Sequence, residues 1–150
     1  YLNRVSGPFL DRIDIGVEVP RQDLGMMAAE KSIDEGSFPQ TEQRNSSAVM
    51  RARVMEARAR QEKRFADESI SYNSQMTRRQ IEEYCRLSGE DAVFLEKVER
   101  QQGISARGHG KILKVARTLA DLDGQAEIGR TQLAEAIGFR SFEKKYWGSL

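Results

Sequence analysis

The chain has 150 residues, with 24 lysines and arginines against 23 aspartates and glutamates. Its net charge of +1 provides no overall field that would select nucleic acid or a membrane surface, so any basic surface has to be local. A single cysteine, Cys85, excludes an internal disulfide, and no apolar run approaches the ~20 residues that span a bilayer, so we expect a cytoplasmic protein that does not enter membranes.

Residues 1–20 contain one strand pattern. Apolar residues alternate with polar ones from Ile13 to Val19, and Pro20 stops the pattern. No second strand of similar quality follows, and a lone strand cannot satisfy its backbone groups. Because its partners are missing and the chain opens on Tyr1 rather than methionine, we expect a piece of a longer protein. Residues 21–45 are polar and aperiodic, which predicts a linker.

A long helix is predicted from Ser46 to about Ala66. Two apolar stripes run along it, and between them lies a cluster of three arginines, Arg53, Arg60 and Arg64. Such a cluster is most often a solvated face, but it could also bind nucleic acid. Both interpretations stay open at this stage.

Further helices carry their own start and stop signals. Thr77 and Gln80 form a capping box, Ser88 opens a helix that Gly103 ends, and Thr131 caps a helix that ends at Gly138. The last of these, followed by a possible helix from residue 141, also has the spacing of a helix-turn-helix. A stand-alone nucleic-acid-binding module is therefore the alternative function.

The central element is a helix from Ser105 to the glycine at 124, with an apolar arc centred on Ala116. Arg107 falls in its first turn, where the helix dipole disfavours a cation. A helix start with free N–H groups is also an anion site, and an arginine beside it supplies a forked phosphate clamp. The two interpretations are a solvated arginine with a carboxylate partner and a phosphate ligand. His109, two residues on, is expected to be structural.

The motifs of a self-sufficient active site are missing from the sequence. It has no G-x-x-x-x-G-K-[ST] phosphate loop, no G-x-G-x-x-G and no G-x-S-x-G, and one histidine with one cysteine cannot assemble a zinc site. We therefore expect no metal ligands and no catalysis from these residues alone. A composition of 31% charged and 7% aromatic residues favours a mainly α fold.

Several of these pieces together resemble magnesium-chelatase-like AAA+ ATPases of the ComM/YifB type. The resemblance is carried by residues 6–20, with Leu-Asp-Arg-Ile-Asp around Arg12, by the helix from Ser46, by Ile-Ser-Ala-Arg ending at Arg107, and by residues 112–122 and 133–136. It covers nearly the whole chain except about 21–44. It implies that 1–20 is the end of the AAA+ core, 21–45 a linker and 46–150 the C-terminal helical lid, a bundle with an N-terminal arm carrying one orphan strand.

The resemblance also implies functional roles. Arg12 corresponds to the arginine finger presented to a neighbouring subunit, and Arg107 to the sensor-2 arginine facing the γ-phosphate of ATP. The parent protein would be a homo-oligomeric ring that uses ATP and Mg²⁺, either a DNA-remodelling helicase or a chelatase-type ATPase. The fragment alone should bind neither cofactor, because the phosphate loop and the Mg²⁺ ligands would lie upstream.

Overall fold

The computed structural model describes residues 12–19 and 46–140, and within them the fold is mainly α, as predicted. Its elements are the helices α4 (Ser47–Arg64), α5 (Arg78–Tyr84), α6 (Gly89–Gln102), α7 (Ala106–Leu122) and α8 (Arg130–Gly138), with the short 3₁₀ helix η2 (Asn73–Gln75) between α4 and α5. No helix in these described ranges is long and apolar enough to cross a bilayer.

Most of the predicted helix boundaries are confirmed. Ser46, Thr77, Ser88 and Ser105 each accept a backbone N–H from the first turn of the helix that they precede. Gly103 and Gly124 both have positive φ, at 67° and 72°, the left-handed conformation that ends a helix cheaply only with glycine.

One cap was predicted wrongly. Helix α8 begins at Arg130 with Gly129 as its cap, so Thr131 lies inside the first turn. The side-chain oxygen of Gln132 accepts the Gly129 N–H at 3.2 Å, which is the half of a capping box that the third residue of the helix supplies.

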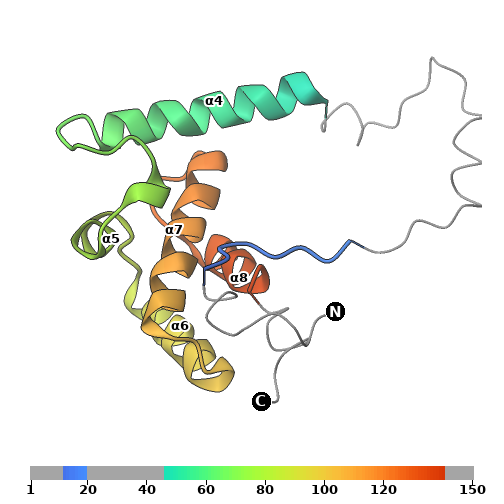
Figure 1. Cartoon of the computed structure of the whole chain (residues 1–150), viewed down its shortest axis with the longest axis vertical. Coiled ribbons are helices and arrows are strands. Elements are labelled where there is room, and N and C mark those ends of the chain that lie inside the picture. The colour runs from blue at the N-terminus through green and yellow to red at the C-terminus, as the bar shows by residue number, and fades with distance from the viewer. Residues whose placement is uncertain (1–11, 20–45, 141–150) are drawn as a thin grey trace, which may run out of the picture.

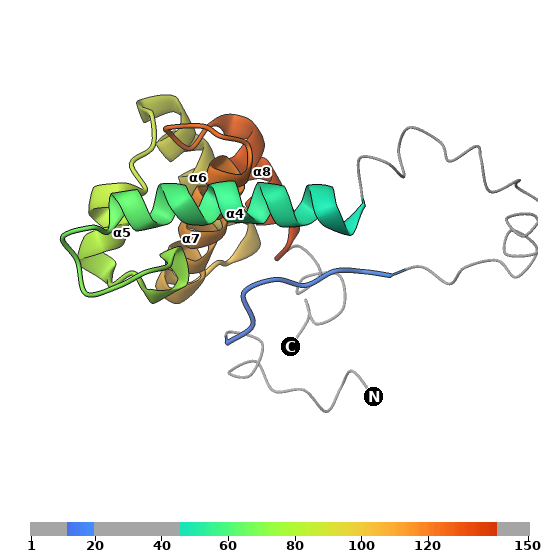
Figure 2. The same cartoon turned by 90° about the horizontal axis from the view of Figure 1, so that it is seen from above.

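Helix α7 runs through the middle of the bundle, and the other helices pack around it (Figures 1 and 2). Its Ile112, Ala116 and Ala120 are fully buried, against Leu95 from α6 and Leu133 from α8. The apolar arc predicted from the sequence is therefore the core face of α7. Each large aliphatic side chain buried here stabilises the fold by roughly 1.5–3 kcal/mol before its entropy is counted.

A buried carboxylate joins α4 and η2 to α7. Asp121 has no exposed surface, and its Oδ2 accepts from Arg64 Nη1 at 2.9 Å and from Asn73 Nδ2 at 2.8 Å, while Arg64 Nη2 bonds to its other oxygen. Arg117, one turn earlier on α7, lies 3.2 Å from the same carboxylate and donates to the Gln125 and Ala126 carbonyls. The buried Arg117 and the partly buried Arg64 thus share one anion, and Asn73 of η2 donates a further hydrogen bond to it.

The pKa of Asp121 reflects these contacts. Burial on its own would raise it, but the hydrogen bonds from Arg64 and Asn73 and the charges of Arg64 and Arg117 outweigh burial and lower the pKa below its usual value. The carboxylate is therefore ionised wherever the protein is folded at neutral pH.

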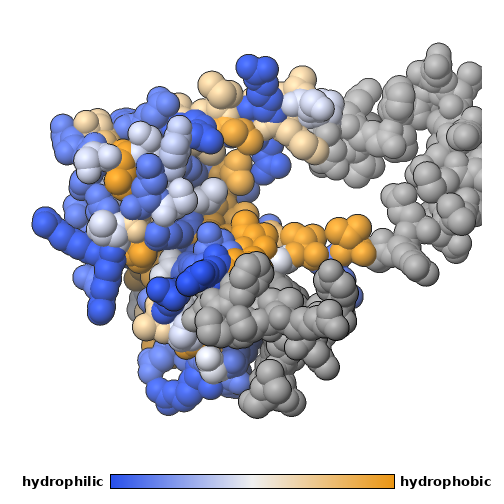
Figure 3. All heavy atoms as spheres, viewed as in Figure 1, coloured by the Kyte–Doolittle hydropathy of each residue, from blue (hydrophilic) through white to orange (hydrophobic). Residues whose placement is uncertain are grey.

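The strand expected at 13–19 does not form within the part of the chain that the structure describes. Residues 12–19 leave the bundle as an extended segment (Figure 1), and no neighbouring strand supplies a ladder. Ile15, Val17 and Val19 are 49%, 70% and 84% exposed. Figure 3 shows these apolar side chains along the segment, with more on the first half of α4 (Val49, Met50, Val54 and Met55).

Asp121→Ala should lower the free energy of unfolding by about 3–5 kcal/mol, because it leaves Arg64 and Arg117 buried without their anion. Urea denaturation followed by circular dichroism measures this. Asp67→Ala, at an exposed aspartate, is the matched control and should change stability by no more than ~0.5 kcal/mol.

The same variant has a pH signature. The pKa of Asp121 is lower in the folded than in the unfolded chain. The contribution of the ionised carboxylate to the free energy of unfolding is therefore complete above the unfolded pKa, about 3.9, and is lost as the pH falls through the folded pKa. The difference in stability between wild type and Asp121→Ala should shrink below pH 4. A difference that stays constant down to pH 2 would contradict the network.

Candidate functional site at the start of helix α7

The first turn of α7 places Arg107 in solvent. Ser105 caps the helix, with its Oγ accepting the Gly108 N–H at 3.1 Å. The Arg107 side chain is exposed and makes no hydrogen bond or ion pair with any described residue. The positions one turn away on its own helix and turn hold Gly103, Ile104, Gly110 and Lys111, so no acid is within i±3 or i±4 reach.

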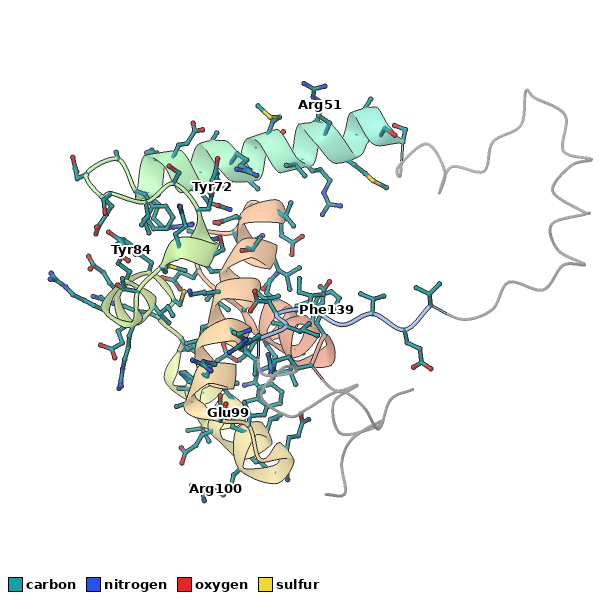
Figure 4. The ribbon with its side chains drawn as sticks, in the orientation of Figure 1. Arg51, Tyr72, Tyr84, Glu99, Arg100 and Phe139 are labelled. Atoms are coloured by element: carbon teal, nitrogen blue, oxygen red, sulfur yellow. The ribbon has the colours of Figure 1, made fainter. Side chains whose placement is uncertain are left out.

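The turn that leads into α7 is held by α6. The left-handed Gly103 lets Ile104 N–H reach the Glu99 carbonyl at 3.0 Å. The Glu99 carboxylate also lies 2.7 Å from Nδ1 of His109, and it is mostly buried, at 17% exposure. Figure 4 shows Glu99 on α6, beside the first turns of α7. His109 thus bridges two helices, the structural role expected for it.

Gly108 packs more closely than any sequence pattern indicated. A Cβ at this position would lie 2.6 Å from Cγ2 of Ile104, 3.6 Å from Oγ of Ser105 and 3.8 Å from Nε of Arg140. The 2.6 Å approach to a branched carbon next to the backbone cannot be relieved by a flexible side-chain end. The glycine therefore lets the capping turn and the end of α8 close on the helix start.

Arg107 also lines a groove of about 860 Å³ between α5, α6 and the first half of α7. Its walls mix basic side chains with acidic ones, and its floor is apolar, with Leu95 and Leu113. Cys85 lies beneath it, and burial raises the pKa of this thiol to about 11, so it is protonated and unreactive at neutral pH.

The segment that carries Arg12 lies against α7 and the end of α8. Lys111 Nζ is 2.8 Å from the Asp14 carboxylate, and the Gly16 N–H donates to the Phe139 carbonyl at 2.9 Å. In Figure 4, Phe139 lies where the segment meets α8. Arg12 itself is exposed. The structure therefore places the segment that follows Arg12 against α7 and the end of α8, more than 90 residues further along the chain.

The three arginines of α4 face the C-terminal end of α7, with Arg53 still largely in solvent and Arg64 mostly buried. Arg64 is bound to Asp121, Arg60 Nη1 donates to the Asp121 carbonyl at 3.2 Å, and Arg53 lies 3.7 Å from the carboxylate of Asp123. All three point to the C-terminal end of α7, where cations stabilise the last carbonyls. Apolar stripes on both sides of the cluster were the signal that it faces another helix.

Comparison with known proteins identifies the family. Residues 44–140 match the family model described as "Magnesium chelatase, subunit ChlI C-terminal". The chain belongs to this family. The expected resemblance is thereby confirmed, and Arg107 lies inside the matched range.

Longer relatives extend the match over nearly the whole chain. Competence protein ComM of Haemophilus influenzae is 40% identical over 142 residues, 94% of this chain, and the uncharacterized protein YifB of Escherichia coli is 39% identical over 144 residues, 96% of it. An uncharacterized protein of Mycobacterium bovis is 29% identical over 140 residues. This chain spans about a quarter of the length of these relatives.

Possible metal ligands are scattered over the described part of this family member. No group of three or more histidine, cysteine, aspartate or glutamate side chains gathers there in a way that could hold an ion.

Gly108→Ala should destabilise the chain by about 1–3 kcal/mol, because overpacking against Ile104 outweighs the better helix propensity of alanine. The matched control is Gly110→Ala, two residues on, where a Cβ would make ordinary contact at 3.5 Å with Ile81. It should stabilise by up to ~1 kcal/mol. Thermal or urea unfolding compares the two, and equal effects would contradict the close packing at 108.

Proposed function

We propose that the chain is the C-terminal lid of an oligomeric, Mg-ATP-dependent AAA+ motor, cytoplasmic and acting either in DNA remodelling or in chelatase-type metal insertion. The single observation that carries this proposal is Arg107. It is an exposed cation at a capped helix start, with no acidic residue one turn away on its own helix and no ion pair to a described carboxylate.

The electrostatics of that position favour an anionic ligand. Arg78 and Arg100 each bind a glutamate one turn along their own helices, at 3.1 and 2.6 Å, as surface arginines commonly do. Arg107 instead adds its charge to the positive end of the α7 dipole. This arrangement is unfavourable without an anion and favourable with a phosphate, which the guanidinium binds through two parallel hydrogen bonds.

The proposed chemistry assigns the two arginines to different nucleotides. Arg107 would bind the γ-phosphate of ATP in its own subunit, and Arg12 would reach the ATP of a neighbour in the ring. Both would stabilise the charge that develops on the transferred phosphoryl group. ATP supplies that group, and the remaining catalytic parts would lie upstream of this chain. The fragment alone should therefore bind neither ATP nor Mg²⁺ tightly.

The alternative, a stand-alone nucleic-acid-binding module, has less support. Arg53, Arg60 and Arg64 all have partners at the end of α7, so their charge is partly neutralised within the lid. The second helix of the possible helix-turn-helix falls at residues 141–147, outside the described residues.

Arg107→Ala and Arg12→Ala should change the stability of the chain by no more than ~0.5 kcal/mol, because both side chains are exposed. In the full-length protein each should lower ATP turnover by at least about 100-fold, the usual loss for a group that contacts the transition state. Arg79→Ala, at another exposed arginine, is the matched control and should keep full turnover.

Mixed oligomers separate the two roles. Arg12→Ala subunits combined with subunits lacking the phosphate-loop lysine should regain activity, because some interfaces then pair an intact finger with an intact site. Arg107→Ala subunits combined with the same lysine-deficient subunits should stay inactive, since neither kind of subunit then has a complete site of its own. Equal recovery would refute the assignment of the arginines to opposite sides of the interface.

A further inference from the structure

Three contacts fasten the segment that follows Arg12 to the first turns of α7, which carry Arg107, and to the end of α8. Lys111 binds Asp14, Arg140 Nη1 donates to the Ile13 carbonyl at 3.1 Å, and the Gly16 N–H donates to Phe139. Their partners in the segment are Ile13, Asp14 and Gly16, all within four residues after Arg12. These contacts link the segment that follows Arg12 to the helix that carries Arg107.

Lys111 is placed for this contact. Its side chain is only 15% exposed, although lysine usually extends into water. One turn away on α7 it has Arg107, Gly108, Lys114 and Val115, so no acid lies within one turn of it on its own helix. Its ammonium reaches Asp14 at 2.8 Å, whose carboxylate is 61% exposed. Its position one turn after Arg107 means that the two side chains share one helical surface.

Arg140 makes the second part of the link. It is a buried arginine at 5% exposure, positioned just after α8. Its Nε lies beside Gly108, 3.8 Å from where a Cβ would be, and its Nη1 binds the backbone carbonyl of Ile13. The Arg140 guanidinium therefore lies between Gly108, which follows Arg107, and Ile13, which follows Arg12.

We propose that Lys111 and Arg140 are positioning residues that fix Arg12 to the start of α7, so that the finger moves with the sensor. This inference rests on the proposed function of the two arginines. When Arg107 binds or releases the γ-phosphate in its own subunit, α7 shifts and the segment 12–16 shifts with it. The position of Arg12 relative to the ATP of the neighbouring subunit then changes. The state of one nucleotide is thus coupled to hydrolysis of the next.

A double-mutant cycle on this 150-residue chain tests the link without any nucleotide. Lys111→Met and Asp14→Asn should each speed hydrogen exchange of the Gly16 amide by roughly two- to fivefold, as expected for a partly exposed ion pair. The double variant should be no faster than either single one, and Lys111→Arg should keep the slow rate. Lys97→Met, at an exposed lysine of α6, is the control.

The amide of Ala116, in the core of α7, reports in the same spectra whether each variant is folded. If Ala116 keeps its protection while Gly16 exchanges at the same rate in all variants, the ion pair does not hold the segment, and the proposal is overturned. If the effects of the two single variants add, the residues act independently, which also overturns it.

Turnover by the full-length protein tests the positioning role. Lys111→Met should lower kcat by about 10- to 100-fold with little change in KM for ATP, because a displaced finger affects the transition state more than ground-state binding. In an Arg12→Ala background the same substitution should have no further effect. A loss that persists undiminished there would mean that Lys111 acts without Arg12, and the proposal would fail.

The two experiments separate this inference from the function on which it rests. If Arg12→Ala leaves turnover unchanged, the finger assignment is wrong and the positioning role fails with it, whatever the exchange rates. If Arg12→Ala lowers turnover but Lys111→Met does not, the proposed function stands and only the link is refuted.

Discussion

The helices are held together around the buried carboxylate of Asp121. It binds Arg64 of α4 and Asn73 of η2 at the last turn of α7, and Arg117, one turn earlier on α7, contacts the same carboxylate. A buried ion pair holds its partners in place, because separating them would leave a buried charge unpaired at a large desolvation penalty. The network therefore fixes the position of α4, whose first half projects beyond the bundle, while the apolar face of α7 supplies most of the burial.

The N-terminal end of α7 carries an exposed side chain, Arg107, on a closely packed turn. Gly103, Ser105 and Gly108 form a tight capped turn, and Glu99 with His109 holds this turn against α6. A rigid support is what a phosphate-binding arginine needs, because its contribution depends on being aimed before the charge develops. The two ends of α7 thus differ: the C-terminal end is bound to α4 and η2 through the Asp121 network, and the N-terminal end carries the exposed Arg107.

Much of this could be predicted from the sequence, since caps, glycine stops and apolar periodicity are local signals. The bounds of α7 and the exposure of Arg107 followed from them. The burial of Asp121 and Arg117 did not, because a periodicity argument treats charged residues as solvent-facing and sees no partner from α4. For the same reason Arg64 was open to a nucleic-acid role. The strand at 13–19 does not form, because a strand needs a paired neighbour and none lies among the described residues. The close contact at Gly108 depends on how the turn before α7 places Ile104, which residue spacing alone does not give.

We propose above that Arg107 contacts the phosphoryl group in transfer. The most direct test compares the affinities of the full-length oligomer for ADP and for ADP with aluminium fluoride, which mimics the transition state. Arg107→Ala should leave ADP affinity within about twofold and weaken the aluminium fluoride complex by at least about 100-fold. An equal loss for the two ligands, or no loss for either, would contradict the account.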